Sequence, residues 1–207
     1  MTRIVLVRHG QTAWNREIRF RGQIDVALDG FGLKQAEATG RYVAARWPVA
    51  AIYASRMSRA MQTAEAIARA HNELNAQPLA GLLDIDFGEW QGLSPDTVSQ
   101  RYPDLYRAWL EAPHTVHFPG GETLEIVRRR VIAGLDEVTA RHPEQTVALV
   151  SHAVVNRVLL CAVLGLGNDH FWRLQQDTCA VNLFDVRDGG TFTLVLMNDT
   201  CHLQGLS

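Results

Sequence analysis

The spacing of apolar residues changes repeatedly along the chain and predicts strands and helices in alternation. Short apolar runs, typical of buried strands, occupy residues 4–7, 49–53, 78–83 and 146–150. Alanine-rich runs and apolar residues at helical spacing predict helices over 29–47, 57–70, 123–141 and 153–164. Two further apolar runs, 179–186 and 192–197, predict a terminal hairpin joined across residues 188–190.

Repeated βα alternation favours an α/β fold, a three-layer sandwich with a mostly parallel central sheet and helices on both faces. No repeat, low-complexity tract or linker interrupts the pattern, so we expect a single domain over residues 1–207. Residues 91–120 carry four prolines and scattered aromatic residues, and Ser94-Pro95 marks a helix start. This segment is expected to form a lid-like insertion.

The composition indicates an ordinary globular protein. Hydrophobic residues make up 47% of the 207 residues and charged residues 20%, with a formal net charge of -2. Nothing in this balance favours a nucleic-acid or membrane partner. Cys161, Cys179 and Cys201 form no CxxC pair and are interpreted as reduced thiols. Without a signal-like or membrane-spanning run, a cytoplasmic location is expected.

The most informative stretch follows the first predicted strand, which ends in Arg8, His9 and Gly10. Open α/β folds bind their ligands at the carboxyl ends of parallel strands. Arginine offers a planar fork of donors that fits phosphate. Histidine can attack phosphorus at neutral pH, and glycine allows the backbone to approach a ligand closely. Together the three residues predict phosphoryl transfer.

Two other predicted strands also deliver polar residues. His152 follows strand 146–150, and residues 54–59, with Arg56 and Arg59, follow strand 49–53. If the strands are neighbours, these side chains converge on the crevice that holds His9. Nearby guanidinium charges would push the pKa of His9 downward and keep its imidazole nucleophilic. The same arginines would bind the oxygens of the transferred group.

Phosphoryl transfer also requires a proton for the departing alkoxide, and residues 82–90 supply three carboxyl groups. Asp84 and Asp86 would face the same side if the preceding strand continues, and Glu89 lies beyond a glycine. A carboxyl beside a phosphate dianion has a raised pKa, which suits a general acid. The alternative for each single feature is structural: an acidic cluster is commonly a solvated face, and the two arginines could pair with it.

Five stretches in order, LVRHGQTAWN, SRMSRAMQTA, IDFGEWQG, FPGGETL and LVSHAVVNRVLL, resemble the motifs of the histidine phosphatase superfamily, also called the phosphoglycerate-mutase-like family. The resemblance covers nearly the whole chain. It implies that His9 becomes phosphorylated and that Arg59 rather than Arg56 belongs to the phosphate pocket. It further implies pocket roles for Arg8, His152, Asn15, Arg21, Gly22 and, through its backbone amide, Ala153.

The chain departs from the family pattern at three positions. Arg21 is not the commonest residue at its position, and Ala153 replaces the usual glycine. The resemblance implies that Asp84 is the proton donor, where glutamate is common. Aspartate is shorter by one carbon–carbon bond, about 1.5 Å. Asp86 and Glu89 therefore stay as alternative donors, and a bridging water or a backbone shift could also compensate.

The function expected is a phosphatase that hydrolyses small phosphomonoesters through a phosphohistidine on His9. Mutases of the family carry a longer segment rich in basic residues, whereas residues 91–120 offer a short set of candidates, Arg101, Arg107, His114 and His117. Mutase-type transfer and a non-catalytic phosphate-binding or docking module are the alternatives. No metal and no cofactor are expected, because carboxylate or thiolate ligands do not cluster with the histidines.

The aromatic residues in and beside the insertion have two interpretations. They could stack on an apolar or aromatic leaving group, or they could pack the insertion onto the domain. The residues concerned are Trp90, Tyr102, Tyr106, Trp109 and Phe118. The sequence leaves open the natural substrate and whether the chain forms a homodimer.

Overall fold

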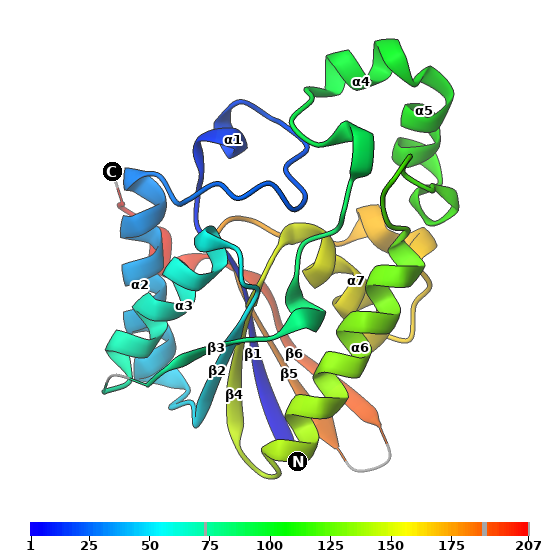
Figure 1. Ribbon diagram of the computed structural model, residues 1–207. Coiled ribbons are helices and arrows are strands. Elements are labelled where there is room, and N and C mark those ends of the chain that lie inside the picture. Colours follow the sequence, from blue (N-terminus) through cyan, green and yellow to red (C-terminus); the bar gives the residue numbers. More distant parts are fainter. Residues whose placement is uncertain (73, 188–189, 207) are drawn as a thin grey trace.

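The protein is described by a computed structural model that covers residues 1–72, 74–187 and 190–206 (Figure 1). Six strands form one sheet: β1 (Thr2–Arg8), β2 (Ala51–Ala54), β3 (Ala76–Pro78), β4 (Thr146–Ser151), β5 (Val181–Arg187) and β6 (Thr191–Asp199). The α-helices are α1 (Ala13–Arg16), α2 (Gly30–Arg46), α3 (Ser58–Ala70), α4 (Pro95–Arg101), α5 (Pro103–Glu111), α6 (Leu124–Arg141) and α7 (Ala153–Val163). Short 3₁₀ helices cover Ala80–Leu82, Gly88–Trp90, Pro113–Thr115, Asn168–Arg173 and Cys201–Leu203.

The sheet is mostly parallel, as the sequence predicts, and its strand order is β3-β2-β4-β1-β5-β6. The strands β3, β2, β4 and β1 run parallel to one another, while β5 pairs antiparallel with both β1 and β6. The neighbours β1 and β4 are in a register that places Arg8 opposite Ser151. The residues that follow these two strands therefore leave the sheet side by side.

Helices cover both faces of the sheet, α2 and α3 on one face and α6 and α7 on the other (Figure 1). Alternate residues of each central strand enter different cores. Ile4 and Leu6 of β1 belong to the core beneath α6 and α7, whereas Val5 and Val7 belong to the core beneath α2 and α3. Since both faces are buried, the central strands carry continuous apolar runs.

Helix starts follow from the local sequence. Asp29, Ser94 and Thr123 precede α2, α4 and α6, and each side chain accepts a hydrogen bond from a backbone N–H of the first turn. Such capping satisfies donors that have no partner inside the helix. The expected helix start at Ser94-Pro95 is confirmed. None of the described helices has the length and apolar character needed to cross a bilayer.

Residues 91–120 form α4, α5 and a short 3₁₀ helix beyond the carboxyl end of the sheet (Figure 1). The aromatic rings Trp90, Trp109 and Phe118 are buried and contact one another, with Trp90 and Trp109 each about 5 Å from Phe118. For these three residues the packing interpretation accounts for the burial. Trp109 also contacts Phe171 and Trp172, so this segment is joined to the main body of the protein.

The third predicted strand is wrong in position. The sequence predicts it over 78–83, but β3 ends at Pro78 and a 3₁₀ helix occupies Ala80–Leu82. Proline lacks the N–H that a strand ladder needs, and Gly81 packs closely on α6, where an added Cβ would lie 2.6 Å from the Arg130 carbonyl oxygen. The terminal hairpin is confirmed as β5 and β6, while residues 188 and 189 of its predicted turn lie outside the described residues.

The fold makes a testable prediction about the central strands. Leu149 of β4 is 1% exposed, so Leu149→Ala should lower the free energy of unfolding by about 2–5 kcal/mol through lost burial and the cavity left behind. Urea denaturation measures the loss. Val195→Ala is the control, because Val195 on the edge strand β6 is 52% exposed and its loss should change stability by less than about 0.5 kcal/mol. Equal effects of the two variants would contradict the strand order.

Candidate active site

Two imidazoles lie together at the carboxyl edge of the sheet. His9 directly follows β1, and His152 follows β4 and caps the N-terminus of α7. Their ring centroids are 5.1 Å apart, and each residue is 1% exposed. The sequence-based expectation that the two histidines converge on one crevice is met.

Hydrogen bonding fixes the tautomer of His9. Its Nδ1 lies 2.7 Å from the carbonyl oxygen of Gly10. A carbonyl oxygen can only accept, so Nδ1 carries the proton and donates. The buried Nε2 atom has no hydrogen-bond partner among the described residues. It therefore presents a lone pair to the crevice, as a nucleophile must.

His152 is held in the opposite tautomer by Arg59. The Nε–H of Arg59, which can only donate, lies 3.3 Å from Nδ1 of His152. The proton of the neutral ring is therefore on Nε2, another buried atom without a partner among the described residues. One histidine thus offers a lone pair to the crevice and the other offers an N–H donor.

The electrostatic surroundings keep both rings uncharged. Burial is the main cause that lowers the pKa of His9 well below its ordinary value, and the charges of His152, Arg59, Arg21 and Arg8 lower it further. Burial also lowers the pKa of His152 well below its ordinary value, and the charge of Arg59 is the next largest cause. The predicted direction for His9 agrees, although burial rather than the arginines is the larger cause.

Arg59 is the second residue of α3 and is fully buried. Its Nη2 donates to Oδ2 of Asp84 at 3.0 Å and to the carbonyl oxygen of Gly22 at 2.7 Å. Arg56 is exposed. The structure therefore brings Arg59, and not Arg56, to the two histidines.

Asp84 is the carboxyl group that reaches this cluster. Its Oδ2 lies 3.3 Å from Nδ1 of His152, and burial raises its pKa above the ordinary value even though Arg59 acts in the opposite direction. An unprotonated Nδ1 and a carboxylate oxygen would face each other with lone pairs alone. A proton on Asp84 removes that repulsion, in agreement with the raised pKa.

The alternative carboxyl groups are engaged elsewhere. Asp86 accepts a hydrogen bond from the backbone N–H of Gly88 at 2.8 Å. Glu89 is exposed and accepts from the hydroxyl of Tyr102 at 2.6 Å. The condition for a common orientation of Asp84 and Asp86 is not met, because the strand does not continue to these residues and a 3₁₀ helix precedes them.

Two further arginines border the crevice. Burial is the main cause that lowers the pKa of Arg8 to about 10 and of Arg21 to about 9, so both stay charged at neutral pH. Arg8 donates through Nη1 to the carbonyl oxygen of Gln176 at 2.6 Å, while its buried Nε has no partner within the described residues. Arg21 donates to the hydroxyl of Thr12 at 3.0 Å. These partly buried cations form an environment suited to an anion.

Three residues expected to contact phosphate, Asn15, Gly22 and Ala153, differ in their structural surroundings. Oδ1 of Asn15 accepts from both the amide and the hydroxyl of Thr12, which leaves its NH₂ group to act as a donor. Gly22 has a φ of +52°, a conformation that favours glycine, and its carbonyl oxygen is bound by Arg59. Ala153 is the first residue of α7, where backbone N–H groups have no partner within the helix.

Arg130 supports the site although it was not among the candidate residues identified from the sequence. This residue of α6 donates through Nη1 to the carbonyl oxygens of Gly81 and Leu83, and through Nη2 to that of Asp84 at 3.1 Å. Its Nε is paired with Glu122 of the FPGGETL stretch at 2.9 Å. Arg130 thus fixes the backbone that carries the Asp84 carboxyl group. Its position on the helix is indistinguishable in sequence from that of its neighbours Arg128 and Arg129.

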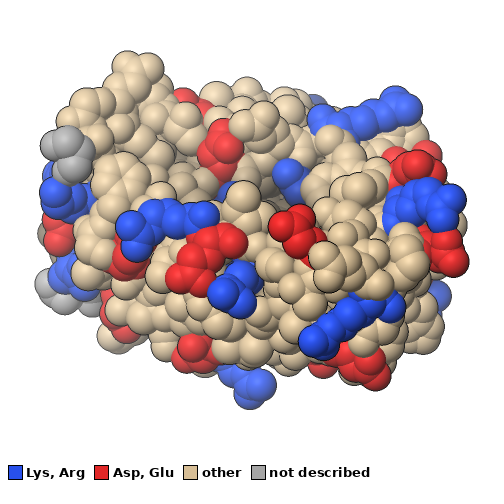
Figure 2. Space-filling view, turned by 90° about the horizontal axis from the view of Figure 1, so that it is seen from above, with Lys and Arg blue, Asp and Glu red and all other residues tan. Residues whose placement is uncertain are grey.

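A cavity of about 290 Å³ adjoins this cluster and reaches Arg21, Asp84 and Ala153. Its size fits a small molecule. Seen from above the sheet edge, acidic and basic side chains are interspersed on the surface rather than gathered in one broad patch (Figure 2).

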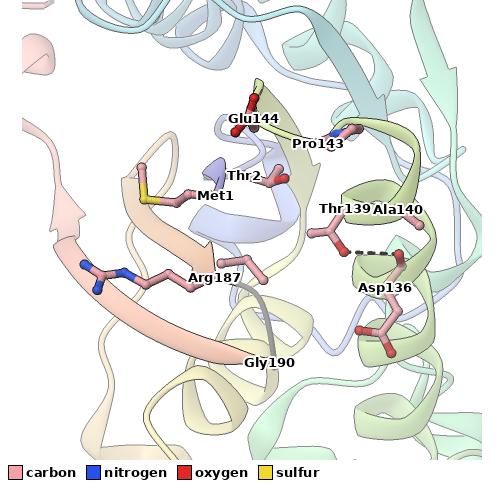
Figure 3. Close-up of a pocket in the computed structure, with 10 residues that line it drawn as sticks. Met1, Thr2, Asp136, Thr139, Ala140, Pro143, Glu144, Arg187 and Gly190 are labelled. Atoms are coloured by element: carbon pink, nitrogen blue, oxygen red, sulfur yellow. Dashed lines mark hydrogen bonds between the residues drawn. The ribbon is translucent and has the colours of Figure 1, made fainter.

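A larger hollow of about 530 Å³ lies elsewhere, where the C-terminal end of α6 meets the start of β1 and the β5–β6 hairpin. Figure 3 shows its lining side chains, among them Asp136, Glu144 and Arg187. The hydroxyl of Thr139 is used in a bond to the carbonyl oxygen of Asp136. No histidine or cysteine lines this hollow, so it lacks the nucleophile found at the sheet edge.

No group of three or more His, Cys, Asp and Glu side chains in the described ranges is placed to hold a metal ion. The residues next to His9 and His152 are mainly guanidinium groups, which repel cations. This arrangement can bind an anion next to the unpaired Nε2 atom of His9 and the Asp84 carboxyl group, whose pKa is raised by burial.

A buried histidine pair among arginines at the edge of a parallel sheet defines a site for phosphoryl chemistry. The model of the histidine phosphatase superfamily (branch 1) matches residues 4–200, and the chain belongs to this family.

The relatives of the chain include phosphatases. It is 37% identical to "Phosphoserine phosphatase 1" of Hydrogenobacter thermophilus, over 98% of this chain and 95% of the relative. It is 34% identical to "Bifunctional protein Rv2228c" of Mycobacterium tuberculosis, again over 98% of this chain but only 55% of that protein. Among solved structures, Bacillus stearothermophilus YhfR superposes with a TM-score of 0.92 at 31% identity, over 99% of this chain and 100% of that chain.

The lowered pKa values of the two histidines predict how stability depends on pH. The unfolded chain takes up protons on these residues below about pH 6.5, whereas the folded protein does so only at lower pH. The free energy of unfolding should therefore fall as the pH falls, by up to about 1.4 kcal/mol per pH unit for each histidine. Asp84 has the opposite effect on stability. Because the folded protein holds the Asp84 proton more tightly than the unfolded chain does, this residue makes the free energy of unfolding rise as the pH falls, in the range just above the ordinary aspartate pKa.

Urea denaturation between about pH 7 and about pH 5 tests this prediction. The double variant His9→Asn/His152→Asn should show a shallower pH dependence than the parent. The matched control replaces the exposed His114 and His117 by asparagine and should keep the parent slope. A buried-pair variant as steep as the parent would contradict the assignment of uncharged rings.

Proposed function

We propose that this protein is a phosphatase that hydrolyses small phosphomonoesters through a phosphohistidine on His9. The observation that carries the proposal is the pair of opposite tautomers, in which His9 directs a lone pair and His152 an N–H into one arginine-lined crevice. Phosphatase relatives support hydrolysis as the reaction. Residues 91–120 offer no cluster of basic side chains that would favour mutase-type transfer.

In the first step Nε2 of His9 attacks phosphorus as the bond to the alcohol oxygen breaks. The electron pair of that bond goes to the oxygen, which takes the proton of Asp84. Arg8, Arg59 and the N–H of His152 bind the phosphoryl oxygens, and the NH₂ of Asn15, Arg21, the amide of Gly22 and the amide of Ala153 are proposed as further contacts.

In the second step a water molecule attacks the phosphohistidine and gives its proton to the Asp84 carboxylate. The P–N bond breaks, inorganic phosphate leaves, and His9 regains its lone pair. Asp84 thus serves as acid and then as base, a cycle that a raised pKa favours because one group must hold and release a proton near neutral pH.

We also propose that the enzyme needs no metal ion, consists of one domain and acts in the cytoplasm. Catalysis is metal-independent, since the charge-stabilising groups at the crevice are arginines. The chain is one domain in which residues 91–120 form a lid-like wall of the substrate cavity, a role supported by Trp109 in the cavity lining. Unpaired Cys161, Cys179 and Cys201 fit the reducing conditions of a cytoplasmic location.

The proposed role of His9 as the nucleophile can be tested by substitution. His9→Ala should lower kcat/KM for p-nitrophenyl phosphate by roughly 10³-fold or more, because the covalent path is lost. Rapid acid-free quenching with labelled ester should trap a phosphoramidate on the parent and none on the variant, with EDTA present throughout. His114→Ala is the control and should retain both properties. Binding of phosphate without turnover in the parent would instead indicate the non-catalytic module.

The proposed role of Asp84 as the proton donor predicts a selective loss of activity. Asp84→Asn should lower kcat/KM for an alkyl phosphate by roughly 10²- to 10⁴-fold, since an alkoxide cannot leave without a proton. The loss should be much smaller for p-nitrophenyl phosphate, whose phenolate leaves unprotonated. Activity of the parent should decline as the pH rises through the raised pKa of Asp84, and this decline should disappear in the variant.

Asp86→Asn and Glu89→Gln are the matched controls for this experiment, because both residues are carboxylates of the same segment bound elsewhere. Neither should change the ratio of alkyl to aryl phosphate hydrolysis. If one of them, and not Asp84→Asn, produces the selective loss on alkyl phosphates, that residue is the donor.

A further inference from the structure

Gln35 of α2 is a buried side chain, 5% exposed, that reaches the peptide group next to His9. Its Oε1 accepts a hydrogen bond from the backbone N–H of Gln11 at 2.9 Å. This N–H belongs to the peptide group that joins Gly10 to Gln11. The carbonyl oxygen of the same peptide group accepts from Nδ1 of His9 at 2.7 Å. Gln35 and His9 are therefore hydrogen-bonded to the two ends of one peptide group.

The bond from Gln35 determines how this peptide group is oriented. A trans peptide is planar, and its N–H and C=O bonds point in opposite directions, so a partner that fixes the N–H also fixes the carbonyl oxygen. The amide of Gln35 has its own orientation fixed, because a backbone N–H can only donate and must face Oε1. At its other end, Nε2 donates to the hydroxyl of Thr178 at 3.1 Å. Both ends of the Gln35 side chain are thus bound.

Helix α2 packs closely on the segment that carries this peptide group. A Cβ added to Gly32 would lie 2.0 Å from the carbonyl oxygen of Gln11, and one added to Gly10 would lie 2.6 Å from that of Gly32. Glycine at both positions lets the segment after β1 lie directly on the first turn of the helix. Gln35 follows Gly32 by three residues, which places both on one side of α2.

Thr178 connects Gln35 to a second segment that holds the backbone at His9. The next residue, Cys179, has its N–H within hydrogen-bonding distance of two carbonyl oxygens, that of Arg8 at 3.1 Å and that of His9 at 3.2 Å. Gln35 thus bridges residues 10–11 and residues 178–179, both of which are hydrogen-bonded to His9. Gln35 does not line the cavity beside the crevice, so its effect on the reaction passes through His9.

We infer that Gln35 is a positioning residue that selects the tautomer of His9. This inference rests on the proposed function, in which Nε2 of His9 attacks phosphorus. By holding the Gly10 carbonyl oxygen at Nδ1, Gln35 keeps the proton on Nδ1 and the lone pair on Nε2. If the peptide group turns away, the proton can move to Nε2, and a protonated Nε2 has no lone pair for the attack. The bond at Nδ1 also keeps the ring oriented while Nε2 carries the phosphoryl group.

Gln35→Met tests this role, because methionine has a similar length but a sulfur that accepts hydrogen bonds only weakly. Gln35→Ala removes the same acceptor with less bulk and replaces the methionine variant if that variant does not fold. Each should lower the rate constant for phosphorylation of His9 in a single turnover by roughly 10- to 100-fold, as expected when a hydrogen bond that supports the reactive form is lost. The inhibition constant for inorganic phosphate should not rise, because the arginines of the crevice are unchanged.

NMR spectra that correlate ring protons with ring nitrogens in isotopically labelled histidine measure the tautomer, because protonated and unprotonated nitrogens have distinct chemical shifts. The His9 signals are those that disappear in His9→Asn. The parent should show a protonated Nδ1 and an unprotonated Nε2, and Gln35→Met should move the Nε2 signal toward the protonated position. Gln35→Glu keeps an oxygen for the N–H of Gln11, and its other oxygen can accept from the Thr178 hydroxyl. It should therefore keep the parent tautomer and most of the phosphorylation rate.

Gln62→Met is the matched control. Gln62 lies on α3, and its Oε1 also accepts from a backbone N–H, that of Leu28 at 2.8 Å. Leu28 is not bonded to His9, so the control should keep the parent tautomer and phosphorylation rate. A merely structural role of Gln35 would lower the thermal stability of Gln35→Met and Gln62→Met alike and leave the tautomer of His9 unchanged.

The inference is overturned if the folded Gln35→Met or Gln35→Ala variant keeps the parent tautomer, whether or not the rate falls. It is also overturned if Gln35→Glu loses the parent tautomer as fully as Gln35→Met does, or if Gln62→Met changes it equally. Each of these results can occur while the parent still forms the His9 adduct, so the proposed function would stand. A parent that forms no adduct and shows no turnover would overturn the proposed function itself.

Discussion

The constraint on which the site depends is the burial of two uncharged imidazoles among guanidinium groups. A charged ring in this position would meet both desolvation and like-charge repulsion, so each ring stays neutral and must choose a tautomer. The Gly10 carbonyl makes that choice for His9, and the Arg59 Nε–H makes it for His152. Two residues of the same type therefore acquire opposite roles, acceptor and donor. The parallel pairing of β1 with β4 is what places them 5.1 Å apart.

Positive charge is incompletely balanced at this edge of the sheet. Arg8, Arg21 and Arg59 surround a single buried carboxyl, Asp84, whose own pKa is raised. Burying cations without enough negative charge beside them is unfavourable, so this edge of the sheet favours a bound anion. The pKa of Asp84 is raised in spite of this positive charge, because desolvation outweighs the attraction of Arg59 and Arg21.

The sequence predicted the sheet class and the neighbours of His9, because these depend on local order along the chain, and the family resemblance favoured Arg59 over Arg56. A strand that ends in Arg-His-Gly can be read from adjacent residues, and so can a helix start after Ser94. The third strand was misplaced because its end depends on the packing of Gly81 against α6, a contact between distant segments. The support of Asp84 by Arg130 was missed for the same reason, since 46 residues separate the two.

Asp84, the side chain proposed as the proton donor, illustrates how such distant contacts position a functional group. An aspartate reaches less far than a glutamate, so its backbone must be brought closer or held more firmly for its carboxyl to serve. Here the Asp84 carbonyl oxygen is bound by both Arg130 and Gln23, while the carboxyl group is bound by Arg59. Three segments of the chain therefore fix one short side chain. The phosphate half of the site is built from strand ends and can be read as motifs. The adjoining cavity gathers Phe20, Phe87, Trp109 and Arg157 from separate parts of the sequence, so its lining could be identified only from the fold.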